Sequence, residues 1–227
     1  MHHTYKNKLR ALLSPAEARV LVKLNTPTRI QDYLEALPHN FSKSAGETCR
    51  SPRQILINQK SRRAYCFEGA LFAAAALAYH GRPPLLLDLQ TTSEDQDHIV
   101  ALFKQNGRWG ALSKTNNPVL RYRDPVYKSV RELAMSYFHE YFLYKSGAKT
   151  MRAYSRPFDL SKYPPEKWVT NEGSLAWLAE VLDASPHLPV VSHNIVKKLR
   201  RATTLERQIL DLEEWEKQTK SSPLSPF

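Results

Sequence analysis

Two residues in the first half of the chain have the types and spacing of a nucleophile and its base. Cys66 stands at the start of an apolar run, residues 67–79, that contains four consecutive alanines. A run of helix formers that is apolar on every side predicts a buried helix, and Gly81 with the prolines after it ends that helix. Unpaired N–H groups and partial positive charge at a helix N-terminus favour thiolate over thiol, so Cys66 is a candidate nucleophile.

His98 stands where a base for that thiol would be needed. Residues 85–90 form a short apolar run typical of a strand, and a second such run, 98–103, begins with His98. An Asn-Gly pair, the strongest short-range hairpin signal, separates this run from a third, 109–113. The predicted order is a helix that opens on a cysteine, a strand, a strand that opens on a histidine, and a returning strand.

This arrangement resembles the transglutaminase-like domain, the cysteine-histidine-aspartate branch of the papain-like fold. The resemblance covers roughly residues 50–116 and rests on Cys66, His98 and the Trp109 of the returning strand. It implies an α+β fold with a papain/transglutaminase-like core, in which the buried helix bearing the cysteine packs on a small antiparallel sheet. The implied reaction is attack on an amide or ester carbonyl to form a thioester, which water or an amine then resolves.

The third member of the site departs from the family. Ser113 lies four residues after Trp109, where the resemblance predicts an acid. A serine hydroxyl can accept a hydrogen bond from an imidazole, but it does not stabilise imidazolium as a carboxylate does. The other candidates for orienting the ring are Asn116, Asp124 and Asp88, the last on the strand beside the histidine.

The first oxyanion donor is the backbone N–H of Cys66 at the helix start. Gln59, seven residues upstream, is the candidate for a second donor, as an upstream glutamine is in papain-like proteases, and Asn58 and Tyr65 compete with it. Tyr65 and Trp109 are expected to line the oxyanion and substrate cleft. The remaining histidines show no metal-ligand spacing, and no glycine-rich phosphate loop is present, so the sequence predicts neither metal nor cofactor.

Composition limits the kinds of partner. Of 227 residues, 42% are hydrophobic and 24% charged, which is ordinary for a globular domain. The net charge of +11 indicates affinity for something acidic: a protein segment, an anionic surface or nucleic acid. The basic residues are scattered and no RNA- or DNA-binding motif is present, so nucleic acid stays an alternative.

The expected setting is cytoplasmic, without a membrane. No run approaches about 18 apolar residues, and the N-terminus lacks the apolar segment of a secretory signal. Two cysteines, Cys49 and Cys66, do not make a disulfide framework. Both are therefore predicted to be free thiols in a reducing compartment.

We expect a single α+β domain over 1–220. It would comprise a helical part over 1–49, the core over 50–116 and a mainly helical part over 117–220, followed by a disordered tail, 221–227. In the third part, Asp124 before a proline is expected to open a helix.

Three functions follow from these patterns. The first is a cysteine-nucleophile acyltransferase or hydrolase whose substrate is a protein or peptide with an accessible amide. The second is a catalytically inactive domain of the same kind that binds a protein or peptide. The third is a basic protein associated with nucleic acid.

Overall fold

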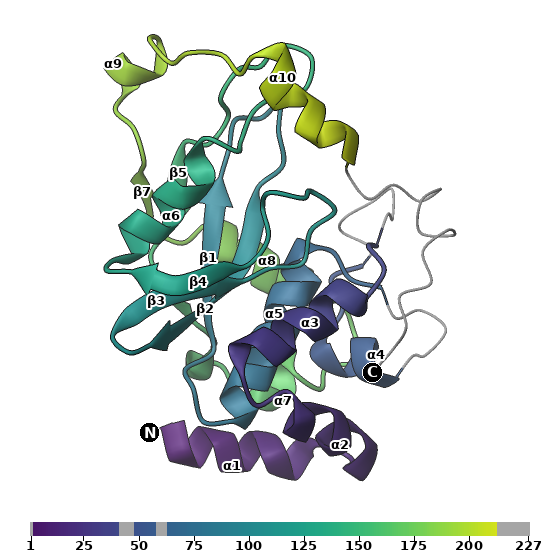
Figure 1. The fold of residues 1–227 in the computed structure, drawn as a ribbon. Helices are drawn as coiled ribbons and strands as arrows, with labels where there is room; N and C mark the ends of the chain where they lie inside the picture. Colours follow the sequence, from purple (N-terminus) through teal and green to yellow (C-terminus); the bar gives the residue numbers. More distant parts are fainter. Residues whose placement is uncertain (1, 41–47, 58–62, 213–227) are drawn as a thin grey trace.

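Helices and one antiparallel sheet make up an α+β fold, which confirms the general class predicted from the sequence (Figure 1). The computed structural model describes residues 2–40, 48–57 and 63–212. The N-terminal helices are α1 (His2–Leu12), α2 (Pro15–Lys23), α3 (Pro27–Ala36), α4 (Pro52–Ile57) and α5 (Cys66–Tyr79). Within these described ranges, no helix is both long enough and apolar enough to cross a membrane.

The sheet has seven strands in the order β4-β3-β2-β1-β5-β7, and β6 also pairs with β1. The strands are β1 (Leu85–Gln90), β2 (His98–Gln105), β3 (Arg108–Leu112), β4 (Arg123–Tyr127), β5 (Ala153–Ser155), β6 (Phe158–Asp159) and β7 (His187–Pro189). The hairpin predicted between the second and third runs is confirmed. Its turn is made by Asn106 and Gly107, whose φ angles are 50° and 76°.

The sheet is buried on both faces, because two separate cores pack against it. In β2, Ile99, Ala101 and Phe103 belong with α5 and the other N-terminal helices, whereas Val100 and Leu102 face the cluster that includes α6 (Val130–Phe138). This is the alternation that a strand imposes on successive side chains. Every residue of α5 after the first is buried, as its apolar sequence predicted.

The part over 117–220, predicted to be mainly helical, contains the four strands β4 to β7 besides its helices. Asp124 lies within β4, and the next helix, α6, begins at Val130 with Ser129 as its N-cap. A proline after an aspartate also suits an edge strand, where the missing N–H has no ladder to break. β4 is such an edge.

The remaining described helices are short. They are α7 (Pro165–Trp168), α8 (Ala176–Asp183), α9 (His193–Val196), α10 (Thr204–Arg207) and the 3-10 helices η3 (Leu160–Lys162) and η4 (Gln208–Leu212). α8 packs its buried Leu178 and Leu182 into the α5 core. The predicted tail, 221–227, lies outside the described residues.

Gly69 allows α5 to approach the chain that follows β3. A Cβ built on Gly69 would lie 2.3 Å from the Cβ of Lys114, and neither atom can turn away by a rotamer change. Overpacking of this kind costs about 1–3 kcal/mol, which outweighs the roughly 1 kcal/mol that alanine gains over glycine inside a helix. We expect Gly69→Ala to lower the free energy of unfolding, measured by urea denaturation, by about 2 kcal/mol.

Gly173→Ala is the matched control. The nearest atom to a Cβ there is the Asn171 side-chain oxygen at 3.3 Å, and the backbone needs no left-handed conformation. Its expected effect is within about 0.5 kcal/mol. Equal stabilities of the two variants would contradict the close packing of α5 on Lys114.

Candidate functional site

Glu68 fixes the start of α5 and so positions Cys66. Its fully buried carboxylate accepts hydrogen bonds from the Tyr65 backbone N–H at 3.3 Å and from Arg50 Nε at 2.8 Å. The Asn40 side-chain amide donates to the same carboxylate at 3.4 Å. The carboxylate thus ties two other stretches of chain and the N-cap residue Tyr65 to the first turn of the helix, at the position where a capping glutamate is favoured.

The Cys66 thiol is partly buried and lines a cavity of about 420 Å³. The other walls are Tyr65 and the loop from Gln90 to Asp97. Burial raises the pKa of the thiol to about 11, although the backbone N–H groups of Ile99, Phe67 and Cys66 itself lower it. The expectation that the helix start holds a thiolate is therefore corrected: the N–H groups are there, but desolvation outweighs them.

His98 is buried on the opposite side of β2 from the α5 core, edge-on to the Tyr137 ring of α6. Its Nε2 lies 2.7 Å from Ser113 Oγ and 3.2 Å from the Leu120 carbonyl oxygen. The Ser113 hydroxyl donates to that same carbonyl at 2.8 Å. Ser113, at the position where the resemblance predicted an acid, thus contacts the predicted base directly.

These three contacts assign the tautomer of His98. A carbonyl oxygen only accepts, and the single Ser113 proton is given to Leu120, so Nε2 must carry the ring proton. Nδ1 then has a free lone pair, and it makes no hydrogen bond to any residue in the described ranges. Burial lowers the pKa of His98 to about 4, so the ring is neutral at pH 7.

The thiol lies at the beginning of the strand that carries the histidine. One of the three backbone N–H groups that lower the pKa of the Cys66 thiol belongs to Ile99, the residue directly after His98. The N-terminus of α5 and the start of β2 were predicted to form the site, and they are therefore adjacent at the peptide unit that joins His98 to Ile99. The side chain of His98 and the helix α5 approach that unit from different faces of the sheet.

The other candidates for orienting the ring lie elsewhere. Asp124 is on the exposed side of β4, because its neighbour Arg123 points inward and lies over the Tyr137 ring, 4.1 Å from its centroid. Asn116 is partly buried in the loop after β3, but the hydrogen bonds of His98 go to Ser113 and Leu120. Neither residue orients the imidazole in this structure.

Asp88 lies on the other face of the sheet and pairs with a different histidine. It stands opposite Ile99 in the β1–β2 register, and its Oδ2 is 3.1 Å from His187 Nε2. Burial and the nearby Asp97 and Asp183 raise the pKa of Asp88 to about 6, although His187 lowers it. Asp88 is therefore not the orienting group of His98.

The predicted cleft residues are separated. Tyr65 lines the cavity beside the thiol, and its hydroxyl is 3.3 Å from Cys49 Sγ. Trp109 instead pairs with Lys104, whose ammonium lies 5.2 Å from its ring centroid. That pair is six residues along β2 from His98, roughly 20 Å away, so Trp109 does not line this cavity. Gln59 lies outside the described residues.

Sequence reasoning missed two parts of the site. The Leu120 carbonyl carries no signal, because any residue type supplies a backbone oxygen. The cavity carboxylates Asp95 and Asp97 do carry one, since they immediately precede His98 in a polar loop between two strands.

Comparison with known proteins adds no family: no protein-family model matches the chain, and no curated protein matches it.

The buried imidazole makes stability depend on pH. The pKa of His98 is about 4 in the folded chain, against an ordinary 6.5. As pH falls below 6.5 the unfolded chain takes up this proton first, so stability present above 6.5 is lost as pH approaches 4. We expect His98 to remove about 3 kcal/mol from the free energy of unfolding over that range, measured by urea denaturation at stepped pH.

The His98→Asn variant cannot take up this proton, so its free energy of unfolding should decline less steeply as pH falls. Carboxylates titrate in both proteins, so the readout is the difference between the two curves. His193→Asn removes an exposed imidazole and serves as the control. Parallel curves for wild type and His98→Asn would contradict a neutral, buried His98.

Proposed function

We propose that the chain is a cysteine-nucleophile enzyme acting on an amide or ester carbonyl, with Cys66 as nucleophile and His98 as base. The observation that supports this most is the tautomer of His98, whose Nε2–H is held by Ser113 and Leu120. A base needs a bare nitrogen in a fixed orientation, and Nδ1 has both. The backbone N–H of Ile99, the residue after His98 in the same strand, lowers the pKa of the thiol.

The reaction would start from a neutral pair. Because the pKa of Cys66 is raised and that of His98 is lowered, thiol and imidazole are both uncharged at pH 7. As sulfur attacks the carbonyl carbon, the thiol proton passes to His98 Nδ1 through one water, because the thiol and the imidazole approach from different faces of the sheet, and the leaving amine takes that proton when the tetrahedral intermediate collapses. His98 then deprotonates water or an amine, which attacks the thioester and releases Cys66.

Ser113 positions the imidazole without neutralising the imidazolium that forms. A carboxylate there would stabilise that charge, so turnover with a serine is expected to be slower than in a cysteine-histidine-aspartate site. The backbone N–H of Cys66 is the candidate oxyanion donor, as it is at the start of a helix. In the proposed reaction, positioning of the imidazole by Ser113 and Leu120 therefore contributes more to the rate than electrostatic stabilisation of the imidazolium does.

The cavity suggests the kind of acceptor. Asp95 and Asp97 line it beside Cys66, so the immediate surroundings of the thiol are acidic although the chain is basic overall. An amine acceptor, cationic in water, is favoured there over an anionic one. Acyl transfer from a protein or peptide amide to an amine is thus the preferred form of the reaction, with hydrolysis as its competitor.

A second function is favoured by the same hydrogen bonds. The Ser113 hydroxyl satisfies the Leu120 carbonyl and thereby holds the chain between β3 and β4 against His98. This contact stabilises the fold whether or not chemistry occurs, so an inactive domain that binds a peptide in the cavity is the alternative. The net charge alone supports an acidic partner, including nucleic acid, and indicates no site for it.

p-Nitrophenyl acetate tests the nucleophile directly. We expect the chain to release nitrophenolate and to carry the acetyl group on the peptide containing Cys66, detected by mass spectrometry. Cys66→Ala should abolish that label, whereas Cys49→Ala, which removes the other free thiol, should retain it. His98→Gln should slow acylation of Cys66 at pH 7 by about 10²–10⁴-fold, the usual contribution of a positioned base.

Circular dichroism checks that the variants are folded. Acylation of Cys66 at the same rate with and without His98 would contradict the proposed base and favour the binding domain. Acetyl groups on both cysteines at similar rates would contradict a specific nucleophile altogether.

A further inference from the structure

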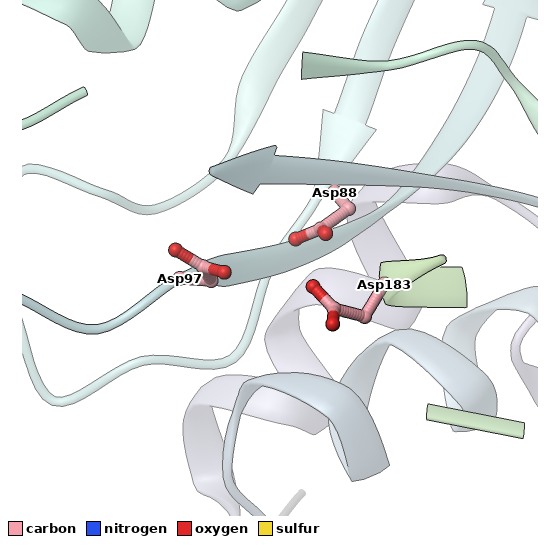
Figure 2. A group of neighbouring side chains, drawn as sticks. All are labelled: Asp88, Asp97 and Asp183. Atoms are coloured by element: carbon pink, nitrogen blue, oxygen red, sulfur yellow. The ribbon is translucent and has the colours of Figure 1, made fainter. Parts of the chain in front are cut away.

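Three carboxylates from separate elements converge beside β1 (Figure 2). Asp88 lies in β1, Asp97 immediately precedes β2, and Asp183 is the last residue of α8. One oxygen from each lies within 4.8 Å of the other two. Carboxylates this close repel one another unless a proton or a cation lies between them.

A second observation distinguishes this cluster from ordinary surface acids. Asp88 is 2% exposed, and its Oδ1 is buried without a hydrogen-bond partner in the described part of the chain. Figure 2 shows its carboxylate directed toward Asp97 and Asp183. A buried carboxylate oxygen without a donor is costly, and native proteins rarely leave one unsatisfied. This unsatisfied oxygen therefore marks the cluster as a candidate ligand site.

The neighbours of the cluster orient its oxygens as neighbours of a metal site do. His187 Nδ1 contacts the Ser185 carbonyl at 2.6 Å, which fixes the ring so that Nε2 faces Asp88 Oδ2. The Thr91 backbone N–H and hydroxyl donate to Asp97 Oδ1 at 2.7 and 2.9 Å. In Asp88 and in Asp97 one oxygen is held by the protein and the other remains available, as is usual for ligating carboxylates.

We propose that Asp88, Asp97 and Asp183 bind one Ca²⁺ ion, with Asp88 Oδ1 as the buried ligand and Asp97 and Asp183 as exposed ones. Hard divalent cations prefer carboxylate oxygens. Ca²⁺ tolerates irregular arrangements of oxygen ligands, whereas Mg²⁺ demands near-ideal octahedral geometry and is usually held by only one or two carboxylates. The exposure of two ligands leaves room for water to complete the coordination.

The ion would lie at the wall of the Cys66 cavity, because Asp97 belongs to both. It would connect the loop before β2 to β1 and to the end of α8, three elements that otherwise present like charges to one another. This role requires neither a reactive thiol nor a base. The proposed calcium site and the proposed catalysis can therefore be refuted independently of each other.

The full-length chain, freed of metal with a chelator, tests the site by thermal unfolding and by calorimetric titration with Ca²⁺ and, separately, Mg²⁺. We expect Ca²⁺ to raise the melting temperature of the wild type. Asp183→Asn should weaken calcium binding at least about tenfold. In chelator, the same variant should melt no lower than the wild type, because it removes one of three mutually repelling charges.

Asp124→Asn, which neutralises an exposed carboxylate in β4, is the matched control and should bind Ca²⁺ as the wild type does. Asp183 is used because it is exposed, so its variant should fold. Equal calcium affinity in wild type and Asp183→Asn would overturn the site, as would the absence of binding at millimolar Ca²⁺ and Mg²⁺. Tighter binding of Mg²⁺ would overturn the assignment to Ca²⁺.

Discussion

The start of β2 is the constraint on which the rest of the structure depends. The sheet is covered on both faces there, so the pleat sends successive residues into different surroundings. Asp97 joins the carboxylate cluster, His98 contacts Ser113, and the Ile99 N–H faces the Cys66 sulfur. A shift of register by one residue would exchange these surroundings and remove all three contacts together.

Burial also explains why a serine suits the position where an acid was predicted. Ser113 Oγ lies between a ring N–H and the Leu120 carbonyl, and a hydroxyl can accept from one while donating to the other. An ionised carboxylate could also accept a hydrogen bond from His98. It has no proton to donate to the Leu120 carbonyl, however, so two acceptors would face each other and a buried negative charge would be left partly unsatisfied. The same desolvation raises the pKa of Cys66 and lowers that of His98. Burial therefore accounts for both the neutral thiol and the neutral imidazole.

Local patterns allowed the core helix and the hairpin to be predicted, because each is specified by neighbouring residues: the alanine run in one case, the Asn-Gly turn in the other. Ser113, the residue after β3, could be placed beside His98 through the resemblance, which puts an acid at that position. The edge strand at Asp124 could not be foreseen, because an Asp-Pro pair suits a helix start equally well. Trp109 was assigned to the correct strand, but at the end far from the thiol.

The carboxylate cluster lay beyond sequence reasoning for a different reason: its members come from β1, the loop before β2 and α8, and only the tertiary fold joins them. The basic charge of the chain does not neutralise this cluster. Exposed charges are screened beyond about 8–10 Å, whereas the three oxygens lie within 4.8 Å of one another. Compensation must be local, and His187 contacts Asp88 Oδ2 and leaves Oδ1 unsatisfied. What this face binds is therefore decided by the balance of charges within a few ångströms, and a chain of net charge +11 can present a site for a cation.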